Sequence, residues 1–185
     1  IGAFNHGFRT PSSIFYMNSL FYLPVVKFYL FHIPALMIMG FANIILIKKI
    51  LDNLNKSGVN FITFFSLFSF LFINIFFYRV GEHGTDRSSQ ILVFILLIEI
   101  LLLINFKYEF DDNLSKIFVL LGLIISLKAF YILYTLFLIP VILHFIKVKD
   151  NFNFLKIIKN KFFIFFILIT FLMLLTNFFN TGCFV

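Results

Sequence analysis

The fold is decided by the segment RVGEHGTDRSSQ, residues 79–90, which lies between two apolar runs. Nineteen largely apolar residues, 60–78, precede it, and sixteen, 91–106, follow it. A helix needs roughly 20 apolar residues to cross a bilayer, so the two runs predict consecutive membrane helices. The polar segment then connects them and places two Arg, a Glu, a His and an Asp at one membrane surface. We expect the functional chemistry of the chain at this surface.

The composition of the whole chain indicates an integral membrane protein. Of its 185 residues 62% are hydrophobic and only 12% are charged, and the mean hydropathy is +1.06. A soluble domain carries about 25% charged residues. The net charge of +7 follows the pattern of an orientation signal, so we expect no nucleic-acid partner. The chain begins at Ile1 without a basic segment before an apolar run, so we predict no signal peptide and a longer parent protein.

The order of apolar and polar runs predicts the helices. A short helix over 12–23, with Thr10 as N-cap and Pro11 at its first position, is expected to lie in the membrane interface. Charged loops are expected at 48–56 and 107–116. The predicted full membrane spans are 28–47, 60–78, 90–106 and 162–178.

Residues 117–146 form an apolar run interrupted by Lys128 and Pro140. They fit either one long kinked helix or a hairpin. The segment 147–161 carries five Lys and one Asp, and only a hairpin returns it to the side of the other lysine-rich loops, as the positive-inside rule requires. Its first arm, 117–127, rises only roughly 17 Å and must be buried among other helices. The prediction is an all-α polytopic bundle of about six membrane helices, forming a single domain over 1–185.

This topology gives the two membrane surfaces different compositions. Ten of the fifteen Lys and Arg residues fall on the cytoplasmic side. The opposite side collects the N-terminal segment, the polar segment 79–90, Lys128 and the C-terminal residues around Thr181. We expect these four segments to converge on one face.

The start of the helix after the polar segment is a candidate anion-binding site. Thr85 or Asp86 can cap the helix, whose free backbone N–H groups and partial positive charge favour a phosphate. Arg87, Ser88 and Ser89 lie beside it in the sequence. The alternative is a capped helix with a solvated loop, and the local sequence by itself favours that alternative.

Other polar residues carry weaker expectations. Glu82 and His83 have the chemistry of an acid/base pair, but neighbours in an extended loop point apart. Lys128 at a hairpin tip would suit an anionic ligand, or its side chain snorkels to the interface. Glu99 lies in mid-span and should face the bundle interior, in a structural role before a catalytic one. No ligand spacing indicates a metal, so neither metal nor cofactor is predicted; a divalent ion held by His6, His83 and acids stays open.

The segment Leu121-Gly-Leu-Ile-Ile-Ser-Leu-Lys128, followed by an apolar run to Pro140, resembles a helical hairpin of GT-C-type membrane glycosyltransferases. The position of Asp86 just before a membrane helix is similar to a polar loop of that superfamily. The ordered set His6–Ser13, Asp86–Gln90, Lys128 and Thr181–Cys183 resembles still more closely an uncharacterised family of bacterial polytopic membrane proteins related to cell-surface polysaccharide assembly.

The resemblance implies transfer of a sugar from a polyprenyl-phosphate carrier at the outer face of the bacterial inner (cytoplasmic) membrane. Its partners would be membrane lipids and the polyprenyl-phosphate-linked sugar. The superfamily's catalytic acid lies in the first outer loop, which would precede Ile1, so no general base is assigned. The residues expected to bind the lipid phosphate or the acceptor are Asp86, Arg87, Ser88, Ser89 and Lys128, with His6, Arg9, Ser12, Glu82, His83, Glu99 and Thr181 as further candidates.

Three other functions remain open. An O-antigen-type polymerase or ligase would share the substrates and the membrane face. A lipid transporter or flippase would need a polar path through the bundle, and Glu99 is the one acid within a predicted span. A structural membrane subunit would tolerate alanine at every polar outer residue. The identities of the sugar and the acceptor, the metal dependence and the oligomeric state do not follow from the sequence.

Overall fold

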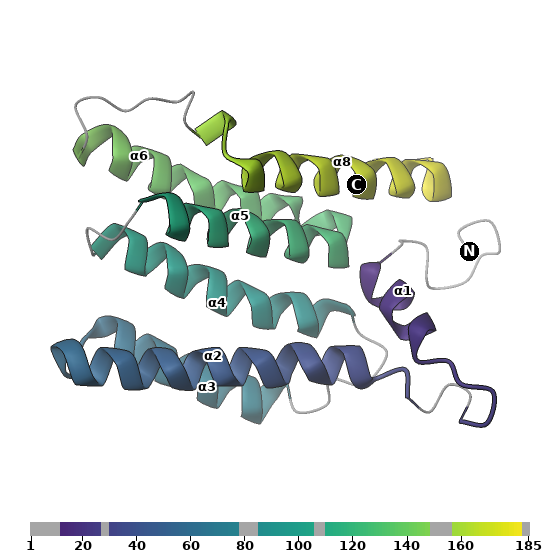
Figure 1. Cartoon of the computed structure of the whole chain (residues 1–185), viewed down its shortest axis with the longest axis horizontal. Coiled ribbons are helices and arrows are strands. Elements are labelled where there is room, and N and C mark those ends of the chain that lie inside the picture. The colour runs from purple at the N-terminus through teal and green to yellow at the C-terminus, as the bar shows by residue number, and fades with distance from the viewer. Residues whose placement is uncertain (1–11, 27–29, 78–84, 106–109, 149–156, 183–185) are drawn as a thin grey trace. The chain divides into compact units, whose positions relative to one another are not determined.

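A computed structural model describes residues 12–26, 30–77, 85–105, 110–148 and 157–182 (Figure 1). Within these ranges the regular structure is helical and contains no β-strand. The helices are α1 (Ser13–Leu20), α2 (Ile33–Ser57), α3 (Phe61–Phe76), α4 (Thr85–Asn105), α5 (Phe110–Leu127), the 3₁₀-helix η2 (Ala129–Phe137), α6 (Leu138–Val148) and α8 (Lys161–Thr181).

Four helical segments in the described part of the chain are long and apolar enough to cross a membrane. They are Ile33–Asn55, Asp86–Ile104, Ala129–Ile146 and Lys161–Asn180, and two shorter apolar helices, Phe61–Phe76 and Asn113–Leu127, accompany them. The all-helical class is therefore confirmed for the described residues, and the four apolar helices have the length and composition of membrane spans. Six spans stay a prediction.

The chain divides into two compact units. The N-terminal unit is Ser12–Ile98, and the C-terminal unit includes the described chain from Glu99 onward. Helix α4 passes from one unit into the other. Each unit is described separately below, and the single domain expected from the sequence stays a prediction.

In the N-terminal unit, α2 and α3 form a tightly packed hairpin. Gly58, with φ +70°, ends α2, and Asn60 caps α3 because its Oδ1 accepts the backbone N–H of Thr63 at 2.8 Å. The buried face of α3 includes Thr63, Ser66 and Ser69, which are small enough to let two membrane helices approach closely.

An amide pair joins the two helices of this hairpin. Asn43 Nδ2 donates to Asn74 Oδ1 at 3.1 Å, and Asn74 Nδ2 donates back to Asn43 Oδ1 at 3.0 Å. Asn74 Nδ2 also donates to the Phe70 carbonyl of its own helix at 2.8 Å. In an apolar environment such a pair fixes the relative position of the helices, because any slip would leave the amides unpaired.

Aromatic rings connect α3 to α4 in the same unit. The ring of Phe94 lies 5.4 Å from that of Phe72 and 6.5 Å from that of Phe65, measured between centroids. Phe65 and Phe72 are seven residues apart on α3, so they share one face of that helix. Phe94 therefore packs across two turns of α3.

In the C-terminal unit, α5 and α8 run parallel and pack along most of α5. Asn160, the N-cap of α8, donates to Ser115 Oγ at 3.1 Å near the start of α5. Further along both helices, the Phe118 ring lies 5.1 Å from that of Phe163 and 6.0 Å from that of Phe166. A Cβ at Gly122 would lie 3.8 Å from Phe166 Cα, which is ordinary van der Waals contact, so α8 leaves room for only a small residue at this position.

The chain reverses direction between α5 and η2. Lys128 is extended, with φ −160° and ψ 128°, and η2 then returns along α5 (Figure 1). The reversal at Lys128 agrees in position with the tip of the predicted hairpin over 117–146, and the arrangement of the membrane spans stays a prediction. Two details differ from the expectation: the first arm begins at Phe110 instead of residue 117, and the second arm begins as a 3₁₀-helix.

Several predicted boundaries are wrong. For α2 and α5 the physical reason is that a helix can continue beyond its apolar run into charged residues. Helix α2 begins at Ile33 and continues through Lys48 and Lys49 to Ser57, where a loop from residue 48 was expected. Helix α5 replaces most of the loop expected over 107–116. Helix α1 begins at Ser13, so Ser12 is its N-cap in place of Thr10, which lies outside the described residues with Pro11.

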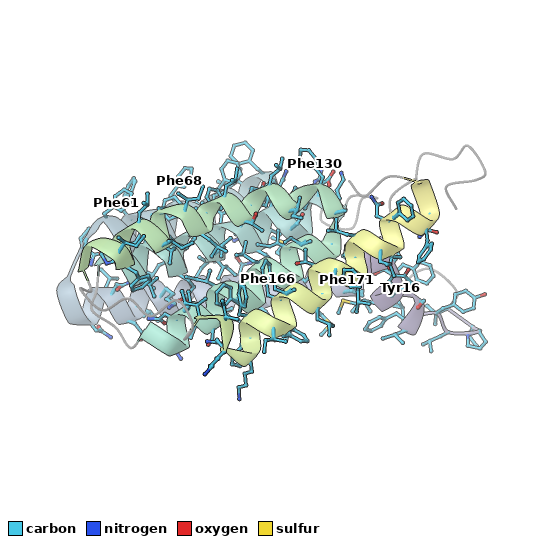
Figure 2. All side chains as sticks on the ribbon, turned by 90° about the horizontal axis from the view of Figure 1, so that it is seen from above. Tyr16, Phe61, Phe68, Phe130, Phe166 and Phe171 are labelled. Atoms are coloured by element: carbon cyan, nitrogen blue, oxygen red, sulfur yellow. The ribbon has the colours of Figure 1, made fainter. Side chains whose placement is uncertain are left out.

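The exposed surface is strongly apolar. Only about a fifth of the residues in the candidate spans of α2, η2–α6 and α8 are buried (22%, 22% and 17%), whereas 61% are buried in that of α4. Phe61, Phe68 and Phe130 point away from the ribbons (Figure 2). Such side chains fit a surface in contact with lipid tails, and α4 is the most interior of the four spans.

Candidate functional site

Helix α4 presents the candidate residues that follow the polar segment 79–90. It begins at Thr85, so Asp86 lies inside the first turn, and neither residue is the N-cap that the sequence predicted. An acid in the first turn still interacts favourably with the positive end of the helix dipole. Asp86 and Arg87 are both half-buried.

The two serines that follow are fully buried but differ in their hydrogen bonds. Ser89 Oγ donates to the Asp86 carbonyl of its own helix at 2.8 Å. Ser88 Oγ has no hydrogen-bond partner among the residues that the structure describes. A buried hydroxyl without a partner costs about 1–3 kcal/mol, so Ser88 is the residue of this pair that a ligand would satisfy.

Helix α1 contributes two more polar atoms of the same kind. Ser12, the N-cap of α1, is only 3% exposed and makes no side-chain capping bond. Within the described ranges, Ser12 Oγ and Asn18 Oδ1 are buried and have no hydrogen-bond partner. Ser12 is among the site residues expected from the sequence, whereas Asn18 is not, although an amide on the otherwise apolar side of a short helix is a signal that the sequence contains.

Helices α1 and α4 bring these residues to one end of the N-terminal unit. Helix α1 packs against α2, and Figure 1 shows it at the end of the unit where α2 and α4 begin. Buried oxygens that have no hydrogen-bond partner among the described residues lie on α1 and in the first turn of α4, and Arg87 of the same turn is half-buried. This end is therefore the strongest candidate site of the unit. We call it the α1–α4 end, defined by Ser12, Asn18 and Asp86–Ser89.

Lys128 belongs to the C-terminal unit and is half-buried at the hairpin tip. Because α5 and α8 run parallel, the last turn of α8 lies toward the same end of this unit as Lys128. Helix α8 ends at Thr181, and Gly182 follows with φ +77°. The Lys128 tip and the end of α8 are two of the four segments that were expected to converge, and their convergence on one membrane face stays a prediction.

Glu99 lies in the span of α4 and is 5% exposed. Its predicted interior position is confirmed. Asn177 on α8 is buried as well. Neither Asn177 nor the hydrogen-bonded pair Asn43–Asn74 was predicted as an interior polar residue. An amide within an apolar span nevertheless indicates such a position.

Four candidates lie outside the described residues, namely His6, Arg9, Glu82 and His83. Among the described residues, no group of three His, Cys, Asp or Glu side chains is placed to hold a metal ion. Metal binding that involves His6 and His83 therefore stays open, because both residues lie outside the described ranges.

Comparisons with known proteins give no family for this chain. No protein-family model matches it, no curated protein matches it, and no solved structure matches it. The function is therefore argued from the residues and the fold.

Proposed function

We propose that this chain is a membrane domain of a GT-C-like glycosyltransferase, which transfers a sugar from a polyprenyl-phosphate carrier during cell-surface glycan assembly. Two features support the proposal. The motif Leu121–Lys128 folds as the tip of a helical hairpin, the structure it has in the superfamily that it resembles. The α1–α4 end offers a half-buried Arg and buried hydroxyls for which the described part of the chain supplies no hydrogen-bond partner.

The single observation that carries the binding role is Ser88. A fully buried Oγ without a hydrogen-bond partner among the described residues, one residue from Arg87 and fourth in a long helix, suits an anionic oxygen. The guanidinium of Arg87 would supply charge and several donors to a phosphate. The Asp86 carboxylate would orient the arginine or accept a hydrogen bond from a sugar hydroxyl.

In the proposed reaction, an acceptor oxygen bonds to the anomeric carbon of the sugar. The bond from that carbon to the carrier phosphate breaks, and the phosphate keeps the electron pair. Arg87 and the start of α4 would stabilise the charge that develops on this phosphate. Lys128 is proposed as a separate anion-binding group at the hairpin tip. The proton of the acceptor hydroxyl passes to a general base, and that role is not assigned to any described residue.

Binding of undecaprenyl phosphate to the purified chain, followed by native mass spectrometry, tests the proposal. Arg87→Ala and Ser88→Ala should each weaken binding about ten-fold, the effect of losing one or two hydrogen bonds to a charged group. Ser69→Ala is the matched control, because Ser69 is equally buried but donates to the Phe65 carbonyl of its own helix at 2.7 Å. Unchanged binding in both α4 variants would remove the site assignment.

A lipid transporter is the second candidate, and the buried Glu99 favours it. Ionisable side chains inside a span commonly mark a transport path. If Glu99→Gln abolishes movement of a fluorescent polyprenyl-phosphate analogue across vesicles and leaves its binding intact, the transporter assignment replaces the transferase. If movement persists, Glu99 has a structural role.

A further inference from the structure

A second charged surface lies at the end of the C-terminal unit opposite Lys128. The hydrogen bond from Asn160 Nδ2 to Ser115 Oγ, 3.1 Å long, joins the starts of α5 and α8. Lys116 follows Ser115 in the sequence, and Lys159 and Lys161 flank Asn160. One hydrogen bond therefore brings three lysines together, and all three are exposed. We call these three residues the lysine cluster.

Exposed apolar side chains begin directly beside the lysine cluster. Ile158 is 42% exposed and Phe162 is 37% exposed, and each is a sequence neighbour of a cluster lysine. The Nζ atom of Lys161 lies 5.4 Å from the centre of the Phe162 ring. Ammonium groups next to large apolar side chains are typical of the level at which lipid head groups meet acyl chains.

Lys116 shows how the described residues use the donors of the cluster. Lys116 Nζ donates to Asn113 Oδ1 at 3.1 Å, and an ammonium group has three donors, so at least part of its capacity is open. A phospholipid phosphate presents several acceptor oxygens and a negative charge, which complements three clustered ammonium groups.

We propose that the lysine cluster is a binding site for the head groups of anionic phospholipids. The Ser115–Asn160 hydrogen bond fixes the spacing of the lysines, so the site is a local one and not merely a consequence of net charge. The proposal is independent of the transferase, because it concerns other residues at the other end of the unit.

The test measures how strongly the purified chain enriches phosphatidylglycerol over phosphatidylcholine in nanodiscs that contain a small fraction of the anionic lipid. Each lysine near an anionic surface contributes about five-fold in affinity. Lys159→Gln with Lys161→Gln should therefore reduce the enrichment by about ten-fold or more. Lys159→Arg with Lys161→Arg should retain it, because the charge is kept.

The matched control removes the same charge elsewhere. Lys48 and Lys49 lie in α2 of the N-terminal unit and do not belong to the cluster. Lys48→Gln with Lys49→Gln should reduce the enrichment far less than the cluster variant does. Equal losses in the two double variants would overturn the proposal, since they would show an effect of net charge alone. Undiminished enrichment in the cluster variant would overturn it as well. Circular dichroism verifies that every variant keeps its helix content.

Discussion

Single buried side chains set the chemistry of the α1–α4 end, and Ser88 is the sharpest case. It shares α4 and full burial with Ser89, yet only Ser89 has its hydroxyl bonded within the helix in the described structure. The free-energy cost of a buried hydroxyl without a hydrogen bond is tolerated at functional sites, where a bound ligand supplies the missing hydrogen bond. Ser88 should therefore behave unlike an ordinary core serine.

Ser88→Ala should stabilise the ligand-free protein by about 1 kcal/mol, because the substitution removes a buried hydroxyl that has no hydrogen-bond partner within the described ranges. Ser69→Ala, which removes a satisfied hydroxyl, should be neutral or slightly destabilising. Unfolding in sodium dodecyl sulfate measures both free energies. A loss of stability in Ser88→Ala would show that this hydroxyl is hydrogen-bonded in the folded protein and would contradict the prediction.

The Asn43–Asn74 pair offers a second prediction for individual residues. Asn74→Leu should destabilise the protein more than Asn43→Leu, because Asn74 keeps its bond to the Phe70 carbonyl when its partner is lost, whereas Asn43 loses both bonds of the pair. A double-mutant cycle should give a coupling of about 1 kcal/mol, in the range measured for polar pairs between membrane helices. Additive effects would mean that the pair makes no net contribution.

Among the elements, the packing of α5 on α8 depends on Gly122. An alanine Cβ there would meet Phe166 Cα and Ile169 Cδ1 at 3.8 Å, which is ordinary van der Waals contact. Gly122→Ala should therefore be neutral or stabilising by up to about 1 kcal/mol, the difference in helix propensity. Gly122→Leu should destabilise by about 1–3 kcal/mol through overpacking.

Unfolding in sodium dodecyl sulfate distinguishes the two Gly122 variants, with Gly40 as the matched control. Gly40 lies in α2 with no atom within 4 Å of an added Cβ, so Gly40→Leu should be tolerated. Equal effects of leucine at the two glycines would contradict the close approach of α5 and α8.

The 3₁₀ conformation of η2 could not be predicted from the sequence. Its most exposed side chains recur every third residue, at Phe130, Leu133 and Leu136, as three residues per turn require. All three exposed residues are apolar, and so is the buried Tyr131 between them. The sequence therefore shows no alternation of polar and apolar residues from which a period of three could be predicted. The break at Lys128 was predictable, because a lysine between two apolar arms is costly anywhere except at a turn.

The helix starts of the candidate site were predicted only to within a turn. A capping residue at 85 or 86 was a sound expectation from side-chain chemistry, but α4 begins at Thr85 and takes both residues into its first turn. The burial of Ser12 and Ser88 depends on packing between segments far apart in the sequence, which residue patterns do not encode. Glu99 was assigned correctly to the interior, since a carboxyl facing lipid tails is expensive.

For the whole molecule, we predict that the chain from α5 to α8 runs through the membrane region, returns and runs through it again. The parallel contacts of α5 with α8 and the reversal at Lys128 support this prediction. Lys116 and Lys159 should then lie on one side of the membrane, and Lys128 should lie toward the other.

Labelling of single cysteines by a membrane-impermeant maleimide in vesicles of known orientation tests this claim most directly. Cys183, the only cysteine of the chain, is first replaced by serine, and Lys116→Cys, Lys128→Cys and Lys159→Cys are then made one at a time. The account predicts that positions 116 and 159 are labelled from the same side and position 128 from the opposite side. Labelling of position 159 from the side opposite to 116, or of 128 from the same side as both, would contradict it.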